Sequence, residues 1–566
     1  MVTIKNEVRA ILAGAAALAS VGVAHADPLP LGSGGIAYYL SGSTAMDNGV
    51  KALLLQGTGG ICNATPDVYI DSTAADITKA HNTLVVCKIS EPLGSGASQV
   101  PSGTLVAFDK ESNGGSLEGI LPISQNIGLK FFTGLQTATA GTLGCTSSVT
   151  VPAGYSSTSP YTYAQQYVLH YGCTPPTTSS TAVPVVGFAD ENPESFNVGS
   201  PTVGSSDIGK IGYQQFVQNV FGIGVSLNMY RALQHAQGLT QNDALANTPT
   251  LSSNAIRSLF AGNVASWSGI TDASGNAINA LTNTGNVAVS NQVYLCRRGD
   301  SSGTNASVGI YFGLDNRCTS SSGGAQFGMA AGNTSVGNCK GYISAFGSAT
   351  NLPTTEYGCS WQNASNSADT VFAGFGGGDV ASCLSYHDTQ NQFALGLLTT
   401  NQGMGDVGGT GGSADSSTST NGRFRFVKID GKAPDLGSVV NGTYDYVMDN
   451  IIVTAKTPTS DTSDLVKYLT NLYFTKAALV RDFMATQPTD SNFTAGVLID
   501  QLNANNTFTP NSTPPYVTGS QVKAGTNGTT TINPVSPFTQ LAINGSDPQD
   551  CGKAWMVANP GVPTNP

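Results

Sequence analysis

Short apolar runs, separated by stretches of helical periodicity, are the main pattern along this chain. Each run has the length and the side-chain types of a buried strand. The runs lie at Val183–Ala189, Val220–Leu227, Gln292–Cys296, Ala394–Leu398, Phe424–Ile429 and Ile451–Thr454. Strands that alternate with helices predict an α/β fold whose sheets are mostly parallel.

Two helices can be placed from the spacing of apolar side chains. Residues 252–261 bring three apolar residues onto one face, with Ser252 or Ser253 as the N-cap and Gly262 as the C-terminal stop. Ser463 is expected to cap a longer helix, because apolar side chains follow it at helical spacing. These side chains are Leu465, Tyr468, Leu469, Leu472 and Tyr473.

The composition limits the kinds of partner. Charged residues are only 10% of the 566 residues and hydrophobic residues are 40%, while 24 Lys and Arg stand against 35 Asp and Glu, a net charge of −11. A chain this acidic offers no basic face to neutralise a phosphate backbone, so nucleic acid is not expected as a partner. The apolar content suffices for a large core and excludes disorder driven by charge.

The first 26 residues have the pattern of a cleavable secretory signal. Two basic residues precede an apolar run at 10–24, and a small-x-small sequence, Ala24-His25-Ala26, precedes Asp27. A membrane anchor is the alternative, but an anchor needs about 18–20 apolar residues and this run is shorter. We therefore expect a periplasmic or secreted protein, mature from about Asp27, with no membrane insertion.

The ten cysteines predict disulfides, because their number is even and the chain is exported. A zinc site would need closely spaced Cys or His pairs such as CxxC, and the sequence has none. The cysteines that lie close in sequence suggest the pairs Cys62 with Cys87 and Cys145 with Cys173. No metal and no cofactor are expected.

The segment with the clearest chemistry is Arg298-Gly299-Asp300-Ser301-Ser302-Gly303-Thr304, between a predicted strand and an apolar periodic stretch. Free backbone N–H groups at a helix start, together with hydroxyl groups, favour an anion. Arg298 adds a fork of donors suited to two oxygens of one oxyanion. An ordinary strand-to-helix turn with a solvated arginine is the alternative.

Three weaker segments gain meaning from their order along the chain. They are the turns at Leu40–Met46 and Ser112–Ser116 and the strand end at Val186–Asp190. In this order the chain resembles the phosphate-specific substrate-binding proteins of bacterial ABC importers, which have the type II periplasmic binding fold. The matches are Gly42-Ser43-Thr44-Ala45, Ser112-Asn113-Gly114-Gly115, Gly187-Phe188-Ala189-Asp190 and the Arg298 segment, with Leu259-Phe260-Ala261-Gly262 and Trp267 between the last two.

The resemblance runs from about Gly35 to Phe483 and has departures. Residues 117–180 and 313–390 are longer than in the family and read as disulfide-bearing insertions. Ala45 stands where the family has a bulky aromatic residue. The chain is more distantly similar to the secreted DING phosphate-binding proteins.

The resemblance implies two α/β lobes that hold phosphate, or a similar oxyanion, between them. Lobe one would comprise 33–222 and 400–566, including an irregular tail, and lobe two 223–399. The implied binding residues are Thr44, Ala45, Ser112, Asp190, Arg298, Ser302, Gly303 and Thr304. Asp190 would accept the proton that phosphate carries and sulfate lacks. ABC importer membrane subunits would be the protein partners.

Other functions compete with this one. A secreted, surface or filament-forming structural protein on the same fold would suit the large insertions and the Asn/Thr-rich tail. Arg298-Gly299-Asp300 also spells a cell-adhesion tripeptide, although the Ser-Gly-Thr continuation fits the anion loop better. An enzyme would need a nucleophile beside a base or a clustered metal site, and the sequence offers neither, so no catalytic residue is expected.

Overall fold

The computed structural model describes residues 29–470 with interruptions, the longest at 149–169, 315–370 and 401–422, and short strands between 497 and 564. The predicted signal segment lies outside the described residues, as does most of the predicted tail. Within the described part, no helix combines the length and the apolar character that crossing a bilayer requires.

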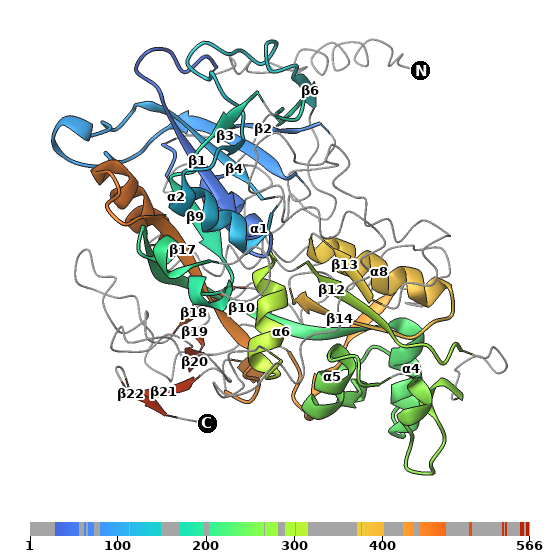
Figure 1. Ribbon diagram of the computed structural model, residues 1–566. Helices are drawn as coiled ribbons and strands as arrows, with labels where there is room; N and C mark the ends of the chain where they lie inside the picture. Colours follow the sequence, from blue (N-terminus) through green and yellow to red (C-terminus); the bar gives the residue numbers. More distant parts are fainter. Residues whose placement is uncertain are drawn as a thin grey trace, which may run out of the picture.

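A single large mixed sheet runs through the molecule (Figure 1). From edge to edge its strands are β13 (Val371–Gly374), β12 (Tyr294–Arg298), β14 (Ala394–Thr399), β10 (Ile211–Ser226), β17 (Val447–Ala455), β9 (Val186–Ala189), β1 (Ile36–Gly42), β4 (Leu105–Glu111), β3 (Asn82–Lys88), β2 (Asp67–Asp71), β7 (His170–Cys173) and β6 (Thr146–Ser148). We call β1–β9 with their helices the first half and β12–β14 with theirs the second half.

Smaller pairings complete the strands. Strands β15 (Phe424–Phe426) and β18 (Val497–Asp500) also pair with β10, and β18 pairs with β19 (Val535–Ser536). The separate pairings are β11 (Thr250–Leu251) with β16 (Lys428–Ile429), β5 (Leu129–Lys130) with β8 (Thr181–Ala182), and β20 (Phe538–Thr539), β21 (Trp555–Asn559) and β22 (Val562–Thr564) in order.

The α/β fold is as predicted, but the expectation of mostly parallel sheets was wrong. Parallel pairs join β9, β1 and β4 in the first half and β13, β12 and β14 in the second, where β13 is the edge strand. Strands β10 and β17 pass through the middle of the molecule in opposite directions, and β2, β3 and β4 follow one another antiparallel. Antiparallel pairs form where the chain crosses from one half to the other and later returns, as in β10 and β17. They also form between strands that are consecutive in the sequence, as in β3 and β4.

The helices α1 (Asp47–Leu54), α2 (Leu121–Gln125), α3 (Ser205–Ile208), α4 (Leu227–Ala236), α5 (Ser253–Phe260), α6 (Gly303–Tyr311) and α8 (Gly377–Thr389) connect these strands. Helix α5 confirms the prediction for 252–261, since the hydroxyl of Ser252 accepts the N–H of Ala255 at 3.1 Å. Gly262 follows with a φ of 73°, in the left-handed region that ends helices and favours glycine.

The predicted start of the last long helix was wrong. The helix already spans 460–470 in the described residues, and the N–H of Ser463 donates to the carbonyl of Thr459 at 2.9 Å. Ser463 therefore lies inside the first turn and does not cap it. The apolar spacing was correct where it can be followed, because Leu465 and Leu469 are fully buried. Leu472 and Tyr473 lie outside the described residues.

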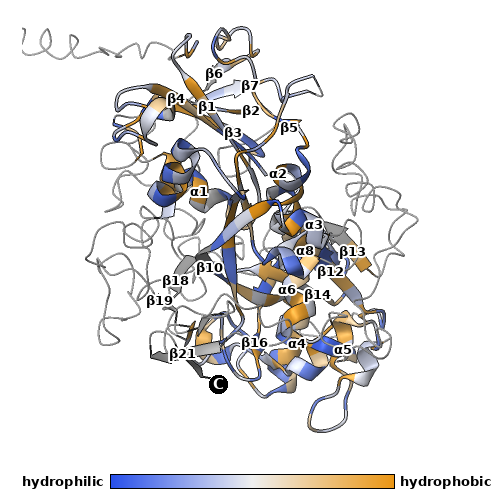
Figure 2. Cartoon of the chain, turned by 60° about the vertical axis from the view of Figure 1, so that its left-hand side comes forward, coloured by the Kyte–Doolittle hydropathy of each residue, from blue (hydrophilic) through white to orange (hydrophobic). Residues whose placement is uncertain are grey.

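Each half contains one of the two largest apolar cores of the described residues. One core gathers side chains from β1, α1, β2, β3, β4 and the 460–470 helix, including Leu53 and Phe108. The other gathers side chains from β10, α4, α5 and β12, with Trp267 fully buried. Apolar side chains from the later part of the chain also pack into this second core, while the predicted lobe boundaries are not tested by it. They are Val427, Ile429, Val439, Tyr444, Tyr446, Val447 and Met448. Figure 2 shows apolar and polar positions side by side on α4 and α5, as amphipathic helices require.

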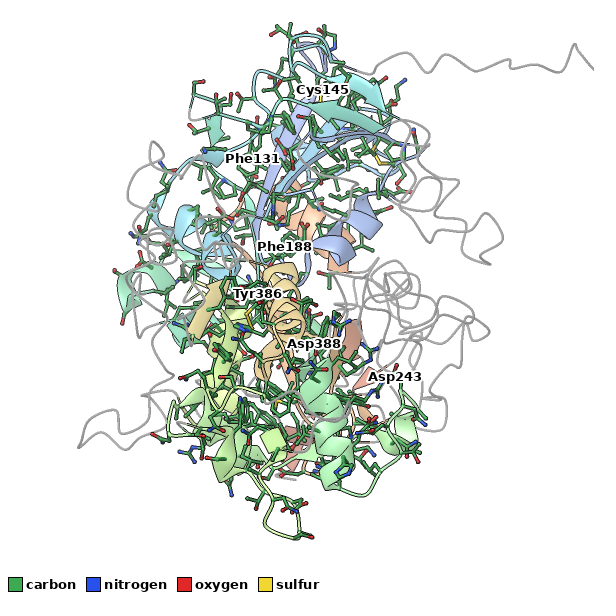
Figure 3. The ribbon with its side chains drawn as sticks, turned by 90° about the vertical axis from the view of Figure 1, so that its right-hand side faces the viewer. Phe131, Cys145, Phe188, Asp243, Tyr386 and Asp388 are labelled. Carbon is green, nitrogen blue, oxygen red and sulfur yellow. A yellow bond between two sulfur atoms is a disulfide. The ribbon has the colours of Figure 1, made fainter. Side chains whose placement is uncertain are left out.

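Three disulfides are present among the described residues. Cys62–Cys87 and Cys145–Cys173 confirm the two predicted pairs, and Cys296–Cys383 joins β12 to α8. The remaining cysteines, Cys318, Cys339, Cys359 and Cys551, lie outside the described residues. Figure 3 shows Cys145 in the first half, Asp243 and Asp388 in the second, and Phe188 of β9 near the middle of the molecule.

Candidate functional site

Four turns meet where the two halves contact each other. Three of them follow β1, β4 and β9, which are parallel neighbours, so their carboxyl ends lie at the same edge of the sheet. The fourth follows β12 in the second half and leads into α6. These are the four turns that the sequence motifs had singled out.

The carboxylate of Asp190, at the end of β9, is the centre of this meeting point. It is 2% exposed. Its Oδ1 accepts hydrogen bonds from the hydroxyl of Ser43 and, at 3.5 Å, from the amide of Asn450. Its Oδ2 accepts a hydrogen bond from the hydroxyl of Thr304 at 3.4 Å. Ser43 belongs to the first half and Thr304 to the second, so both halves donate hydrogen bonds to the same carboxylate.

The hydroxyl of Ser116 joins the same two halves through backbone groups. It accepts the N–H of Asp190 at 2.9 Å and the N–H of Gly303 at 3.1 Å. A Cβ atom at Gly303 would lie 2.5 Å from this hydroxyl and 2.6 Å from the Cβ of Asp190. Glycine is therefore required at position 303 for so close an approach.

The guanidinium of Arg298 is the cation of the site. It lies at the end of β12, is 3% exposed, and donates through Nη2 to the hydroxyl of Thr44 at 3.1 Å. Two residues before it, Cys296 is bonded to Cys383 of α8. The strand that carries Arg298 is thus covalently tied to its neighbouring helix.

Burial dominates the electrostatics of Asp190. Desolvation raises the pKa of the Asp190 carboxyl above its ordinary value, and the hydrogen bond from Ser43 and the positive charge of Arg298 oppose that rise. A charged carboxylate is costly in this environment unless further donors reach it. A ligand that brings a proton to the carboxylate would relieve this cost.

The hydroxyl of Ser302 has no hydrogen-bond partner among the described residues, although the residue is only 2% exposed. Buried hydroxyl groups in native proteins nearly always have a partner. Ser302 sits in the turn before α6, where its Cα would lie 3.3 Å from a Cβ placed on Gly115 of the first half. A ligand oxygen between the halves would supply the missing partner.

Two predicted residues make other contacts in the structure. The hydroxyl of Ser112 donates to the carbonyl of His81 at 3.2 Å. The N–H of Ala45 donates to the hydroxyl of Ser43 at 3.1 Å. The structure brings the remaining predicted residues to the meeting point of the halves: Thr44, Asp190, Arg298, Ser302, Gly303 and Thr304.

Sequence reasoning missed three residues at this point. Ser43 and Ser116 lay inside the turn motifs, but their neighbours were chosen as the site residues. Asn450 carried no motif, since it comes to Asp190 only through the pairing of β17 with β9. Asp300 lies outside the described residues.

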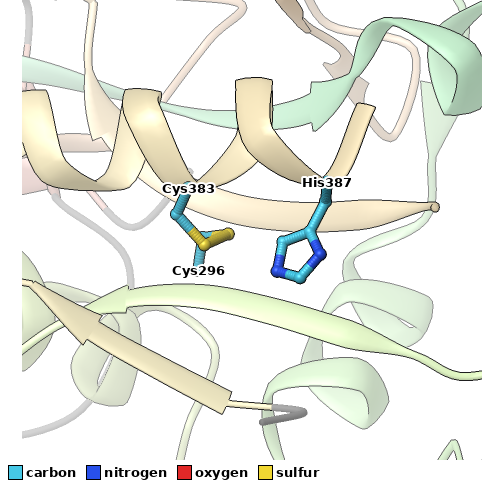
Figure 4. Close-up of side chains that lie close together, drawn as sticks. All are labelled: Cys296, Cys383 and His387. Atoms are coloured by element: carbon cyan, nitrogen blue, oxygen red, sulfur yellow. A yellow bond between two sulfur atoms is a disulfide. The ribbon is translucent and has the colours of Figure 1, made fainter. Parts of the chain in front are cut away.

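A second group of polar side chains lies beside the strand of Arg298. The sulfurs of Cys296 and Cys383 and a ring nitrogen of His387 all lie within 4.8 Å of one another (Figure 4). Both sulfurs are bonded to each other in the disulfide, so neither is available as a thiolate ligand for a metal ion. The Nδ1 of His387 lies 2.7 Å from the side-chain oxygen of Gln392, and its ring stacks on Tyr294 at 4.3 Å. These contacts make His387 part of the packing around the disulfide.

No protein-family model matches the sequence, and no curated protein matches it. Among solved structures, the chain is similar to a protein from Clostridium perfringens assigned to phosphate ABC transport and crystallised with bound phosphate, with a TM-score of 0.35, 10% identity, and coverage of 79% of this chain and 96% of that one. It is also similar to PstS from Borrelia burgdorferi, with a TM-score of 0.30, 9% identity, and coverage of 79% and 96%.

An ABC-type phosphate transport receptor from Vibrio cholerae has a TM-score of 0.26 and 12% identity, over 53% of this chain and 79% of the receptor. Scores and identities at this level carry no conclusion about what this chain binds. The fold is α/β, and the candidate site is described from the contacts of Asp190 and Arg298 in this chain.

Proposed function

We propose that the protein is an exported solute-binding protein that holds phosphate, or a similar oxyanion, between its two halves and delivers it to an ABC-type importer. One observation carries the proposal. Asp190 of the first half and Arg298 of the second converge with hydroxyl groups from both halves. In this reading the protein binds and releases its ligand and is not an enzyme.

An acceptor, a cation and several neutral donors suit an anion that still carries a proton. Phosphate near neutral pH retains a proton and can donate it to Asp190, while Arg298, Thr44, Ser302 and Thr304 donate to the other oxygens. Sulfate has no proton, so its oxygen would face the carboxylate lone pair to lone pair. Local donors thus allow an acidic protein to bind an anion.

Ligand access requires the two halves to separate. In the structure the N–H of Leu117 donates to the carbonyl of Ser301 at 3.1 Å, so the turns touch directly. The paired strands β10 and β17 connect the halves, and a small bend in them would part the turns. We therefore assign them the hinge of a domain closure.

The test is calorimetry of the full exported chain with inorganic phosphate and with sulfate. The unmodified protein should bind phosphate in preference to sulfate. Asp190→Asn should weaken phosphate binding by roughly tenfold or more and narrow the gap to sulfate, because the amide donates where the carboxylate accepts. Equal affinity for the two anions in the unmodified protein would remove Asp190 from this role. Binding of neither would favour a structural protein on the same fold.

A further inference from the structure

Asn450 of β17 lies beside the key carboxylate. Strands β17 and β9 pair antiparallel, with Ile451 opposite Ala189 and Ile452 opposite Phe188. One step further in this register places Asn450 opposite Asp190. The side chain of Asn450 is fully buried, and its Nδ2 donates to Oδ1 of Asp190 at 3.5 Å.

The orientation of the Asn450 amide is determined by its other contact. Its Oδ1 accepts the backbone N–H of Asn219 at 3.1 Å. A backbone N–H can only donate, so the oxygen of the amide must face Asn219 and its NH₂ group must face Asp190. The amide therefore presents a donor to the carboxylate, and this orientation follows from chemistry.

The two oxygens of Asp190 have different surroundings as a result. Oδ1 accepts from Ser43 and Asn450, both of the sheet edge that carries Asp190. Oδ2 accepts from the hydroxyl of Thr304 at 3.4 Å, and the hydroxyl of Ser116 also donates to the carboxylate. Both donors are hydroxyl groups, which can turn their protons toward another acceptor. An incoming O–H group finds spare acceptor capacity at Oδ2.

We propose that Asn450 is a specificity-determining positioning residue, which occupies Oδ1 of Asp190 so that Oδ2 is left to receive the proton of the ligand. This inference rests on the proposed function and identifies the ligand class more closely, as oxyanions that carry a proton at neutral pH. Because the partner of Asn450 is Asn219 of β10, the orientation of Asp190 also depends on the pairing of the two strands that connect the halves.

The test measures the ratio of phosphate to sulfate affinity in the full chain by calorimetry. Asn450→Ala should lower this ratio by roughly tenfold. Without the hydrogen bond from Asn450, the charged carboxylate of Asp190 can rotate or take up a proton itself. Asn450→Ser keeps a polar side chain and should lower the ratio by less; it serves if the alanine variant does not fold.

The matched control is Asp449→Asn. Asp449 is the neighbouring residue on β17, is 1% exposed, and accepts a hydrogen bond from Gln218 of β10. This variant alters a buried polar contact between the same two strands, so it should change stability and leave the anion ratio as it is. The ratio of phosphate to sulfate affinity therefore distinguishes positioning of Asp190 by Asn450 from a general destabilisation of β10 and β17.

The outcomes divide clearly. A lower ratio in the Asn450 variants with an unchanged ratio in Asp449→Asn supports the inference. An unchanged ratio in a folded Asn450 variant, or an equal loss in the control, overturns it while the proposed function stands. If the unmodified protein binds neither anion, the proposed function fails and the inference fails with it.

Discussion

Two buried charged clusters lie close together in this molecule and differ in how their charges are compensated. One is the cluster of Asp190 and Arg298. The other, which we call the lysine cluster, consists of Asp47, Lys51 and Lys110. Asp47 forms ion pairs with both lysines, and the two lysines are fully buried. Lys110 also donates to the carbonyls of Gly42 and Glu111, each at 2.9 Å.

The difference lies in where the partners come from. All groups of the lysine cluster belong to the first half, as do Glu111 and Glu118, whose carboxylates also act on Lys110. The charges are therefore compensated within that half. The contacts of Asp190 are mostly neutral hydroxyl and amide groups, and Thr304 and Arg298 reach it from the second half. A cluster closed within one half supports the fold, whereas a cluster shared between halves can respond to a ligand.

The largest expected effect is on stability, from breaking the lysine cluster. Lys110→Met should cost about 3 kcal/mol in the free energy of unfolding, because the buried carbonyls of Gly42 and Glu111 lose their donor and the carboxylates that act on Lys110 lose a cation. Urea unfolding measures this. Lys467→Met is the control: its side chain is 60% exposed and pairs with Asp464 at 3.0 Å, so a change within about 0.5 kcal/mol is expected. Similar losses in both variants would contradict the comparison.

A smaller effect of opposite sign is expected from Asp190→Asn in the ligand-free protein. Burial raises the pKa of Asp190 above its ordinary value of 3.8. The folded state therefore holds this proton more tightly than the unfolded state, and the carboxyl favours folding at low pH. Its contribution becomes unfavourable as the pH rises from 3.8 through the raised pKa, and it stays unfavourable above that.

The variant should thus be more stable than the unmodified protein at neutral pH, and this advantage should shrink as the pH falls toward 4. Thermal unfolding in phosphate-free buffer across this pH range is the measurement. The charged group that acts on Asp190 is Arg298, and it keeps its charge throughout. A stability difference that did not depend on pH would show that Asp190 has the same pKa in the folded and unfolded states, which would contradict the effect of burial on this carboxyl.

The smallest expected effect comes from Ser302→Ala. The loss of one neutral donor should weaken phosphate binding by roughly three- to tenfold, which corresponds to about 0.7–1.4 kcal/mol. The ligand-free protein should not lose stability, since the Ser302 hydroxyl has no partner among the described residues. Ser307→Ala is the matched control on α6, because its hydroxyl donates to the carbonyl of Thr304 at 2.7 Å. A stability loss for Ser302→Ala as large as for the control would argue against a ligand-facing hydroxyl.

The local features of this protein could be predicted from its sequence. Strand runs such as Ala394–Leu398 and the helix over 252–261 depend on side chains within one turn or one strand, so their patterns are visible without the fold. The two predicted disulfides close loops of 25 and 28 residues. The turn from Arg298 to Thr304 was recognisable because its donors are neighbours in sequence.

The tertiary structure alone decided which of these turns meet. Cys296 and Cys383 are 87 residues apart in the sequence, and Asn450 and Asp190 are 260 apart. The hydroxyl of Ser112 donates to the carbonyl of His81. Each of these contacts follows from strand order and register, which are set by how the whole chain buries its apolar surface. The sequence by itself determined the backbone conformation around the candidate donors, and only the packed sheet determined which acceptor each donor reaches.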